Sequence, residues 1–366
     1  MRVFHLLAER FIELDAIPHA LPEQGFLWLG SARREFEVGS AEVQAALQRW
    51  TGGMLVDLHI ADLLNNQLPS HFDTTSWYDL MIFRRLAAGA GSKGLFVGDE
   101  RGTASSARRA LAAIDTSPVG FALFDRVLLT VHPTDCAVRD YFAQRMSGLA
   151  AGGEQRGSAR LPSSAAELML RMLNHMVDNY LDLRRLLTRQ LGTLQAELLD
   201  PKSRFEDWQI LLESRNTLHF LEDTCEDQRS AVQEWIDALD EWPDEASTEA
   251  RRERELLRLR SRDVQEHIER VLGHVRRLEQ SAETSVQMHF SALGHRTNDI
   301  MRTLTVLTAI FLPLNLITGF FGMNFEALAL IHSSTGFWVA FASMVVVGLG
   351  LIAFFRVKRY IGSSAR

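Results

Sequence analysis

Two long uncharged segments dominate the pattern of hydrophobic and polar positions, and both lie toward the C-terminal end of the chain. Residues 303–325 contain no charged side chain, and residues 327–355 contain none apart from the titratable His332. A helix needs roughly 20 apolar residues to cross the hydrocarbon core of a bilayer. The sequence therefore predicts two transmembrane helices, at 303–325 and 336–355, rather than helices buried in a large soluble core.

Basic residues at the ends of these segments indicate how they cross the membrane. Arg296 and Arg302 precede the first segment, and residues 356–366 form a basic tail, whereas the loop at 326–335 contains no lysine or arginine. Positively charged flanks stay preferentially on the cytoplasmic side. We therefore expect a multi-pass protein of the inner (plasma) membrane, with both termini in the cytoplasm and the short loop outside.

Residues 1–155 mix short apolar runs with amphipathic segments, which is typical of a domain containing both strands and helices. The runs predicted as strands are Phe26–Gly30, Met54–Leu58, Tyr78–Ala87 and Pro118–Val131. The segments predicted as helices are Ala41–Trp50 and Ser105–Ala113. We expect residues 1–155 to form a cytoplasmic α+β domain with α/β/α layers.

A helical hairpin is expected at residues 160–245. Ser164 and Glu167 have the spacing of a capping box, and they begin a helix that Pro201 ends. A second helix follows and ends before Pro243.

The next segment predicts a stalk. No proline occurs between Pro243 and Pro313, so a single helix is expected from about residue 247. At ~1.5 Å rise per residue, its length is on the order of 100 Å. Residues 246–302 thus form a stalk helix that leads directly into the first membrane segment.

Charge is distributed unevenly along the chain. The 366 residues carry a net charge of -7, and the residues from 303 onward carry four basic and one acidic side chain, which is +3. The first 302 residues therefore carry -10. This acidic balance argues against a nucleic-acid partner, and two cysteines exclude a disulfide-stabilised scaffold.

Motifs of enzymes and resident cofactors are missing from the sequence. Gly89, Gly91 and Gly94 satisfy the dinucleotide-binding pattern G-x-G-x-x-G, but the following LFVGDE favours a strand instead of the required helix. A glycine-rich hairpin connection is the better interpretation. The sequence contains no Walker A, H-E-x-x-H or G-x-S-x-G motif. We therefore expect no catalytic residues and no cofactor.

The end of the first membrane segment carries the most specific motif. Gly322, Met323 and Asn324 close the string NDIMRTLTVLTAIFLPLNLITGFFGMNF, which a short loop, a second span and a basic tail follow. This arrangement resembles the CorA family of divalent-cation channels over roughly residues 295–360. Other positions in the string that match the family pattern are Asn298, Met301, Arg302, Leu304, Thr305, Phe311, Pro313 and Gly319.

The resemblance implies a funnel-shaped homopentamer in membrane lipid, with the first spans around a central pore. Steps of three and four residues back from Gly322 define a stripe that would face the pore. The stripe consists of Gly322, Gly319, Asn315, Leu312, Thr308, Thr305, Met301 and Asn298. The alternative is that its polar side chains bond to backbone carbonyls or to a neighbouring helix.

Each part of this segment has an expected role. The GMN residues would form the outer selectivity ring, in which the Asn324 amide oxygens accept hydrogen bonds from a hydrated cation, since Mg²⁺ dehydrates reluctantly. The expected polar lining is Asn298, Asn315, Thr305 and Thr308, and the expected hydrophobic gate is Met301, Leu304 and Leu312.

The outer loop departs from the magnesium-transporting pattern. It keeps Glu326 but has Leu330 where the family's second acid would fall, and it contains His332. These features are nearer to the ZntB branch of the superfamily. The cation therefore stays open between Mg²⁺ and Zn²⁺, Co²⁺ or Ni²⁺. A zinc–proton symporter and a non-conducting membrane-anchored scaffold or stress sensor are the alternatives to a channel.

The three-and-four stepping continues into the stalk as a largely polar stripe. Its members are His295, Ser291, Met288, Thr284, Ser281, Arg277, His274, Arg270, His267 and Asp263. The stripe predicts either the lining of a hydrated cytoplasmic funnel or a solvated outer face. Asp263 stands near the position of a family sensor residue. Acidic clusters at 222–223, 226–227 and 237–245 are candidate cation sensors too, or simply a solvated helix face.

Overall fold

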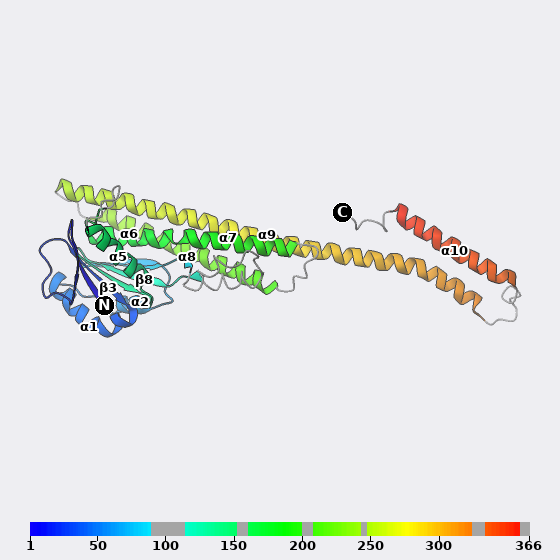
Figure 1. Ribbon diagram of the computed structural model, residues 1–366, viewed down its shortest axis with the longest axis horizontal. Coiled ribbons are helices and arrows are strands. Elements are labelled where there is room, and N and C mark those ends of the chain that lie inside the picture. Colours follow the sequence, from blue (N-terminus) through cyan, green and yellow to red (C-terminus); the bar gives the residue numbers. More distant parts are fainter. Residues whose placement is uncertain (89–113, 152–159, 200–207, 243–246, 324–333, 359–366) are drawn as a thin grey trace. The chain divides into compact units, whose positions relative to one another are not determined.

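The computed structural model describes residues 1–88, 114–151, 160–199, 208–242, 247–323 and 334–358 (Figure 1). The chain divides into two compact units, Met1–Ser285 and Val286–Arg366. A single helix, α9 (Thr248–Phe321), contributes to both. The two units are described separately below.

A seven-stranded sheet forms the centre of the first unit, in the order β2-β1-β3-β9-β8-β5-β4. Every neighbouring pair is antiparallel except β3 and β9, which are parallel. The strands are β1 (Arg2–Leu6), β2 (Phe11–Leu14), β3 (Phe26–Ala32), β4 (His71–Thr74), β5 (Asp79–Arg84), β8 (Pro118–Leu123) and β9 (Val127–His132). A separate two-stranded ladder pairs β6 (Ala87–Ala88) with β7 (Ile114–Asp115).

The strands send alternate side chains to two separate cores, as the period of two requires. On β3, Leu27 and Leu29 face one core, together with Phe36 and Leu47 of α1 (Arg33–Thr51) and Leu63 of α2 (Asp57–Leu64).

On the opposite face of the sheet, Trp28 and its neighbours face a larger core built with the remaining helices. These are α5 (Ala137–Ala150), α6 (Ala165–Asp178), α7 (Tyr180–Leu199), α8 (Trp208–Glu241) and the first half of α9. Helices therefore cover both faces of the sheet, which is the expected α/β/α layering (Figure 1).

The predicted strand at Met54–Leu58 is wrong. The helix α2 begins at Asp57, and the segment before it pairs with a side chain instead of a sheet. The Leu55 N–H donates to Oε1 of Gln44 at 2.8 Å, and the Leu55 carbonyl accepts from Nε2 of the same residue at 2.8 Å. Because Gln44 satisfies this backbone, the apolar run needs no neighbouring strand.

The other predicted strands are present, and Pro118–Val131 folds as the hairpin β8–β9. The predicted helix at 41–50 lies within α1. The helix expected to begin at Ser164 is divided at Asn179 into α6 and α7. The predicted helix at 105–113 and the glycines at 89–94 lie outside the described residues.

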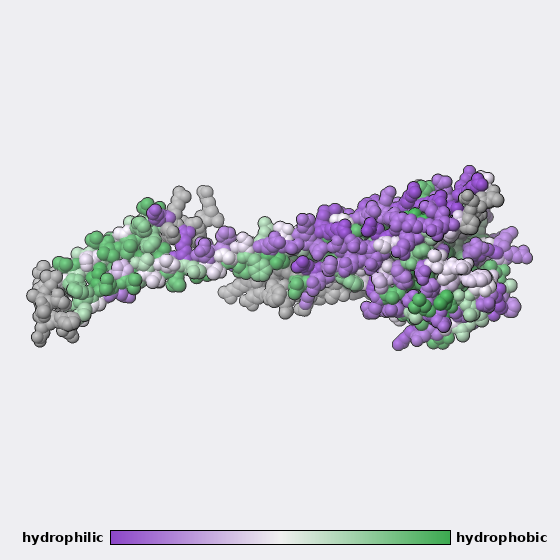
Figure 2. All heavy atoms as spheres, turned by 180° about the vertical axis from the view of Figure 1, so that it is seen from behind, coloured by the Kyte–Doolittle hydropathy of each residue, from purple (hydrophilic) through white to green (hydrophobic). Residues whose placement is uncertain are grey.

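The second unit consists of the end of α9 and α10 (Ser334–Val357). Helix α9 continues through Pro313 to Phe321. Both helices are long and apolar enough to cross a membrane, and only 6% and 11% of their most apolar windows are buried. Figure 2 shows hydrophobic side chains over this unit, as expected for a surface that lipid or another protein covers.

Candidate functional site

The predicted pore stripe forms one continuous exposed face of α9. All eight positions of the stripe, from Asn298 to Gly322, are exposed in the chain. The buried residue Val306, which is 6% exposed, and the half-buried Pro313 and Ile317 lie on another face of the helix. The stripe is therefore free to meet water, lipid or another copy of the chain.

The threonines of the stripe already have partners within their own helix. The Thr305 hydroxyl donates to the Met301 carbonyl at 2.8 Å, and the Thr308 hydroxyl donates to the Leu304 carbonyl at 2.9 Å. These bonds match the alternative interpretation of the sequence, in which the hydroxyls are satisfied by the backbone. Each hydroxyl oxygen still has lone pairs that can accept a hydrogen bond from water.

Asn315 differs from these threonines because its side chain has no hydrogen-bond partner among the described residues. The residue is exposed on an apolar helix. An unpaired amide in hydrocarbon is costly. Asn315 therefore requires water or a polar partner from outside the chain.

The first two residues of the GMN motif are described by the structure. The Gly322 N–H donates to the Thr318 carbonyl at 2.9 Å, and the Met323 N–H donates to the Phe320 carbonyl at 3.4 Å. A Cβ atom added at Gly322 would lie 3.0 Å from the Thr318 carbonyl oxygen. Glycine therefore permits the closely wound end of α9. Asn324, Glu326 and His332 lie outside the described residues.

The polar stripe of the stalk does not form one uniform face. The buried seam of α9 consists of Leu257, Val264, Ile268, Val271, Leu272, Val275 and Ala282. The stripe residues His267, His274 and Ser281 each precede a seam residue by one position, so they lie at the edge of this packed seam.

These three residues contact other helices of the same chain. His267 Nδ1 lies 3.1 Å from Asp178 of α6, and the Ser281 hydroxyl accepts from Gln195 of α7 at 2.9 Å. His274 is only 8% exposed. His274 is therefore packed inside the chain and does not line a funnel. His267 is half-buried, and Ser281, Arg270 and Arg277 are exposed.

His274 is held as a neutral base. Its Nδ1 lies 2.7 Å from the Tyr180 hydroxyl, and its Nε2 lies 3.4 Å from Oγ1 of Thr188. Burial, together with the nearby Arg184 and Arg277, lowers the pKa of His274 to about 4. The unprotonated Nδ1 of His274 can then accept a hydrogen bond from the Tyr180 hydroxyl.

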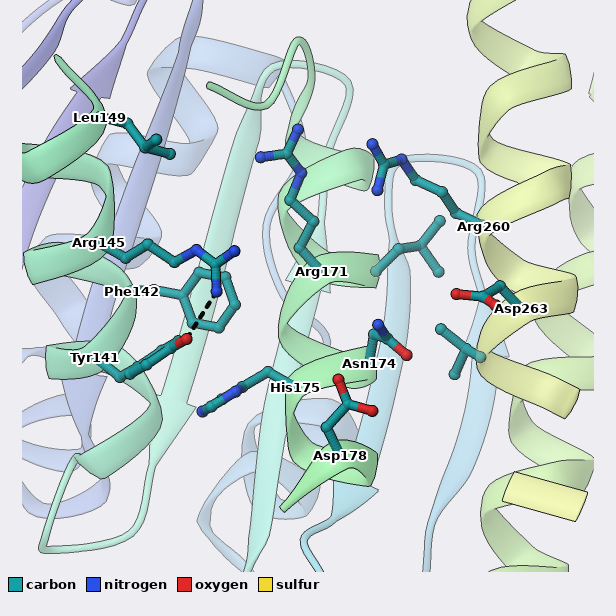
Figure 3. A pocket seen from close by; sticks show the side chains of 12 residues that line it. Tyr141, Phe142, Arg145, Leu149, Arg171, Asn174, His175, Asp178, Arg260 and Asp263 are labelled. Carbon is teal, nitrogen blue, oxygen red and sulfur yellow. Dashed lines mark hydrogen bonds between the residues drawn. The ribbon is translucent and has the colours of Figure 1, made fainter. Parts of the chain in front are cut away.

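Asp263, the candidate sensor, lines a cavity of about 470 Å³ between α5, α6 and α9 (Figure 3). Asp178 also lines this cavity. His267 lies between the two carboxylates, with its Nδ1 3.1 Å from Asp178 and its Nε2 4.0 Å from Asp263. The surroundings also contain Arg171 and Arg260. Within one chain, these arginines oppose the binding of a cation beside Asp263.

The sequence did not identify this cavity, because its residues come from three helices. Arg145 donates to the Tyr141 hydroxyl at 2.7 Å, and the Tyr141 ring stacks on His175 with centroids 3.9 Å apart. Arg171 and Arg260 both contact the carboxylate of Glu167, at 2.7 and 2.8 Å.

Glu167 connects the start of α6 to this cavity. Burial would raise its pKa, but the Ser163 N–H at 2.7 Å and Arg171 outweigh burial and hold the pKa below its usual value. The expected capping box is half present: the Ser164 hydroxyl accepts from the Glu167 N–H, while the Glu167 carboxylate bonds to Ser163.

The acidic cluster at 222–227 is paired with α9. Arg276 lies 2.6 Å from Glu222 and also pairs with Glu226. These carboxylates therefore neutralise a cation of the same chain, in addition to presenting charge to solvent.

In the part of the chain that the structure describes, a layered α/β/α domain is followed by a long helix that becomes apolar and by a second apolar helix, both long enough to cross a membrane. The family model described as "CorA-like Mg2+ transporter protein" matches residues 105–359. The chain belongs to this family.

Curated relatives share short stretches of sequence with this chain. The cobalt/magnesium transport protein CorA of Thermotoga maritima is 29% identical over 100 residues, which cover 27% of this chain and 28% of the relative. The protein of the same description from Methanocaldococcus jannaschii is 41% identical over 66 residues, covering 18% and 21%. These alignments thus span less than a third of the relatives' lengths.

Similarity of the fold extends over nearly the whole chain. The complete structure of the CorA magnesium transporter from Methanocaldococcus jannaschii gives a TM-score of 0.71 at 19% identity, covering 97% of this chain and 96% of that one. The full-length CmaX protein gives a TM-score of 0.54 at 18% identity, covering 98% and 97%. At these identities the comparison shows the fold.

Proposed function

We propose that this protein passes hydrated divalent cations through a membrane pore built from copies of the first apolar helix. The observation that carries the proposal is the exposed stripe of α9, in which polar Asn298, Thr305, Thr308 and Asn315 alternate with apolar residues. Lipid does not satisfy the side-chain amide of Asn315 in this stripe. A ring of identical helices around water does, because each amide and hydroxyl can then bond to water or to a hydrated ion.

The assembly proposed is a homopentamer, as the resemblance to the CorA family implies. The GMN residues form the outer ring, and Asn324 accepts hydrogen bonds from the water shell of the ion. Met301, Leu304 and Leu312, all exposed on the single chain, form the hydrophobic constriction. Both termini lie in the cytoplasm of a cell whose inner membrane holds the protein.

The driving force is the membrane potential. An inside-negative potential favours entry by ~2.3 kcal/mol per charge per 100 mV, so a divalent cation needs no other energy source. Relatives described as cobalt/magnesium transport proteins support Mg²⁺ and Co²⁺ as cargo. The loop with Leu330 in place of an acid supports a second candidate, zinc carried with protons.

Uptake into proteoliposomes tests these proposals. We expect the wild type to take up at least one of Mg²⁺, Co²⁺, Ni²⁺ and Zn²⁺, and Asn324→Ala to abolish uptake while leaving the oligomer intact. Zinc uptake that rises with an imposed pH gradient supports the symporter. No uptake of any of these ions refutes transport and supports a non-conducting scaffold or sensor.

A further inference from the structure

We propose that His219, Glu222 and Glu279 form a binding site for a borderline divalent cation such as Zn²⁺, Co²⁺ or Ni²⁺, within one chain and apart from the pore. One ligand atom from each of the three side chains lies within 4.8 Å of the other two. His219 and Glu222 come from α8, and Glu279 comes from α9. The site thus joins two helices of the first unit.

The helices place these groups together for a simple reason. His219 and Glu222 are three residues apart, so they share one face of α8. Directly beside them, Leu218 and Leu221 of α8 and Val275 of α9 are 0% exposed and pack in the common core. The apolar seam therefore fixes the two helices, and the three polar side chains end at its rim.

The donor set indicates the kind of metal. An imidazole nitrogen with two carboxylate oxygens suits zinc and its neighbours, whereas Mg²⁺ prefers oxygen ligands alone. Ligands about 2.0–2.2 Å from Zn²⁺ lie roughly 3.4 Å apart in a tetrahedron, so small side-chain rotations close the site. His219 is exposed, which leaves room for the metal to enter and for water as a fourth ligand.

Among the described residues, Glu222 forms an ion pair, whereas Glu279 has Arg215 nearby but no ion pair with it. Glu222 pairs with Arg276 at 2.6 Å, and Arg276 also pairs with Glu226. The Glu279 side chain instead contacts the Glu222 carboxylate. A metal ion bound between Glu222 and Glu279 would relieve the repulsion of the two adjoining carboxylates, while Arg276 would keep Glu226 as its partner.

This site is distinct from the proposed sensor Asp263, which lies in the cavity between α5, α6 and α9. The sequence offered only the weak signal of a histidine three residues before a glutamate. Glu279 joins them through the packing of α8 on α9.

Metal binding to the purified, chelator-treated full-length protein in detergent tests the site. With excess Mg²⁺ present, we expect the wild type to bind one more Co²⁺ or Zn²⁺ per chain than His219→Ala or Glu279→Gln, and bound Co²⁺ to show a spectrum of imidazole coordination. Removal of a ligand should weaken this binding at least tenfold, since even groups behind the ligands contribute ~10–100-fold. Glu283→Gln, an exposed carboxylate one turn further along α9, is the matched control.

Thermal unfolding gives an independent readout. Zn²⁺ should raise the Tm of the wild type and of Glu283→Gln, but not that of Glu279→Gln. The metal-free Glu279→Gln variant should melt above the metal-free wild type, because it lacks the contact between two carboxylates. Equal metal binding by wild type and His219→Ala overturns the proposal. Asn324→Ala should retain this metal, so a failure of transport leaves the site intact.

Discussion

The hydroxyl of Tyr180 on α7 lies 2.7 Å from Nδ1 of His274 on α9. Both residues are buried in the core that joins the sheet to the long helices. Burial raises the pKa of the Tyr180 hydroxyl, so it is a proton donor at every physiological pH. The neutral imidazole of His274 is the acceptor, which ties the stalk to the neighbouring helix only while the imidazole is uncharged.

Stability should therefore fall as the pH drops below the ordinary pKa of histidine. His274 has a pKa of about 4 in the folded chain against 6.5 unfolded, so the unfolded chain binds more protons between these values. At pH 5 the cost is at most about 2 kcal/mol of unfolding free energy. We expect His274→Gln to show a smaller fall in Tm between pH 7.5 and pH 5 than the wild type.

A second buried histidine, His132, is present in both proteins and serves as an internal reference for this comparison. His132 is fully buried, and its pKa of about 3, lowered by burial, contributes the same acid sensitivity to wild type and variant. Identical Tm changes in both proteins would show that His274 is not held neutral.

Glu167→Gln should destabilise the first unit. Glu167 is 4% exposed, accepts hydrogen bonds from Ser163 and Arg171, and forms an ion pair with Arg260. A neutral amide would therefore leave two guanidinium groups short of a counter-charge. We expect a loss of about 2–4 kcal/mol, measured as a lower Tm. Glu37→Gln on the exposed face of α1 should melt like the wild type; an equal loss in both variants would contradict the assignment.

Asn315→Leu tests the pore stripe. If Asn315 faces water in an oligomer, its removal raises the barrier for a hydrated cation, and a tenfold drop in flux corresponds to about 1.4 kcal/mol. Ile317→Leu, on the half-buried face of the same helix, should transport normally. Ion uptake into liposomes with matched protein content makes the measurement, and undiminished uptake by Asn315→Leu would remove this residue from the pore.

Gly322→Ala should impair transport by disturbing the end of α9. The added methyl carbon would lie 3.0 Å from the Thr318 carbonyl oxygen, closer than normal contact. We expect uptake to fall at least tenfold, with assembly retained on size-exclusion chromatography. Gly348→Ala in α10, where an added carbon meets nothing within 4 Å, is the matched control. Normal flux through Gly322→Ala would show that the pore mouth tolerates this crowding.

Local patterns predicted the elements wherever one physical preference dominated. The apolar runs around Trp28 and Phe121 form strands, and the uninterrupted segment after residue 247 forms α9. The prediction failed at Leu55, because the side chain of Gln44 supplies the hydrogen bonds that a neighbouring strand would have supplied. No local sequence pattern predicts that a side chain will form hydrogen bonds with the backbone of a residue eleven positions away.

Length, charge and hydrophobic period are local properties of the chain. They were enough to predict the two apolar helices, the stalk that leads into the first of them and the family to which the GMN motif points. Which side of the stalk is buried depends instead on the helices that pack against it. The seam through Val264 and Val275 lies one position away from the polar stripe, so His274 packs inside while Arg277 stays exposed. The packing of α8 on α9 also places Glu279 beside His219. Contacts between helices depend on how each helix is rotated about its own axis. The packing of the apolar faces in the core fixes this rotation, and a local sequence pattern does not show it.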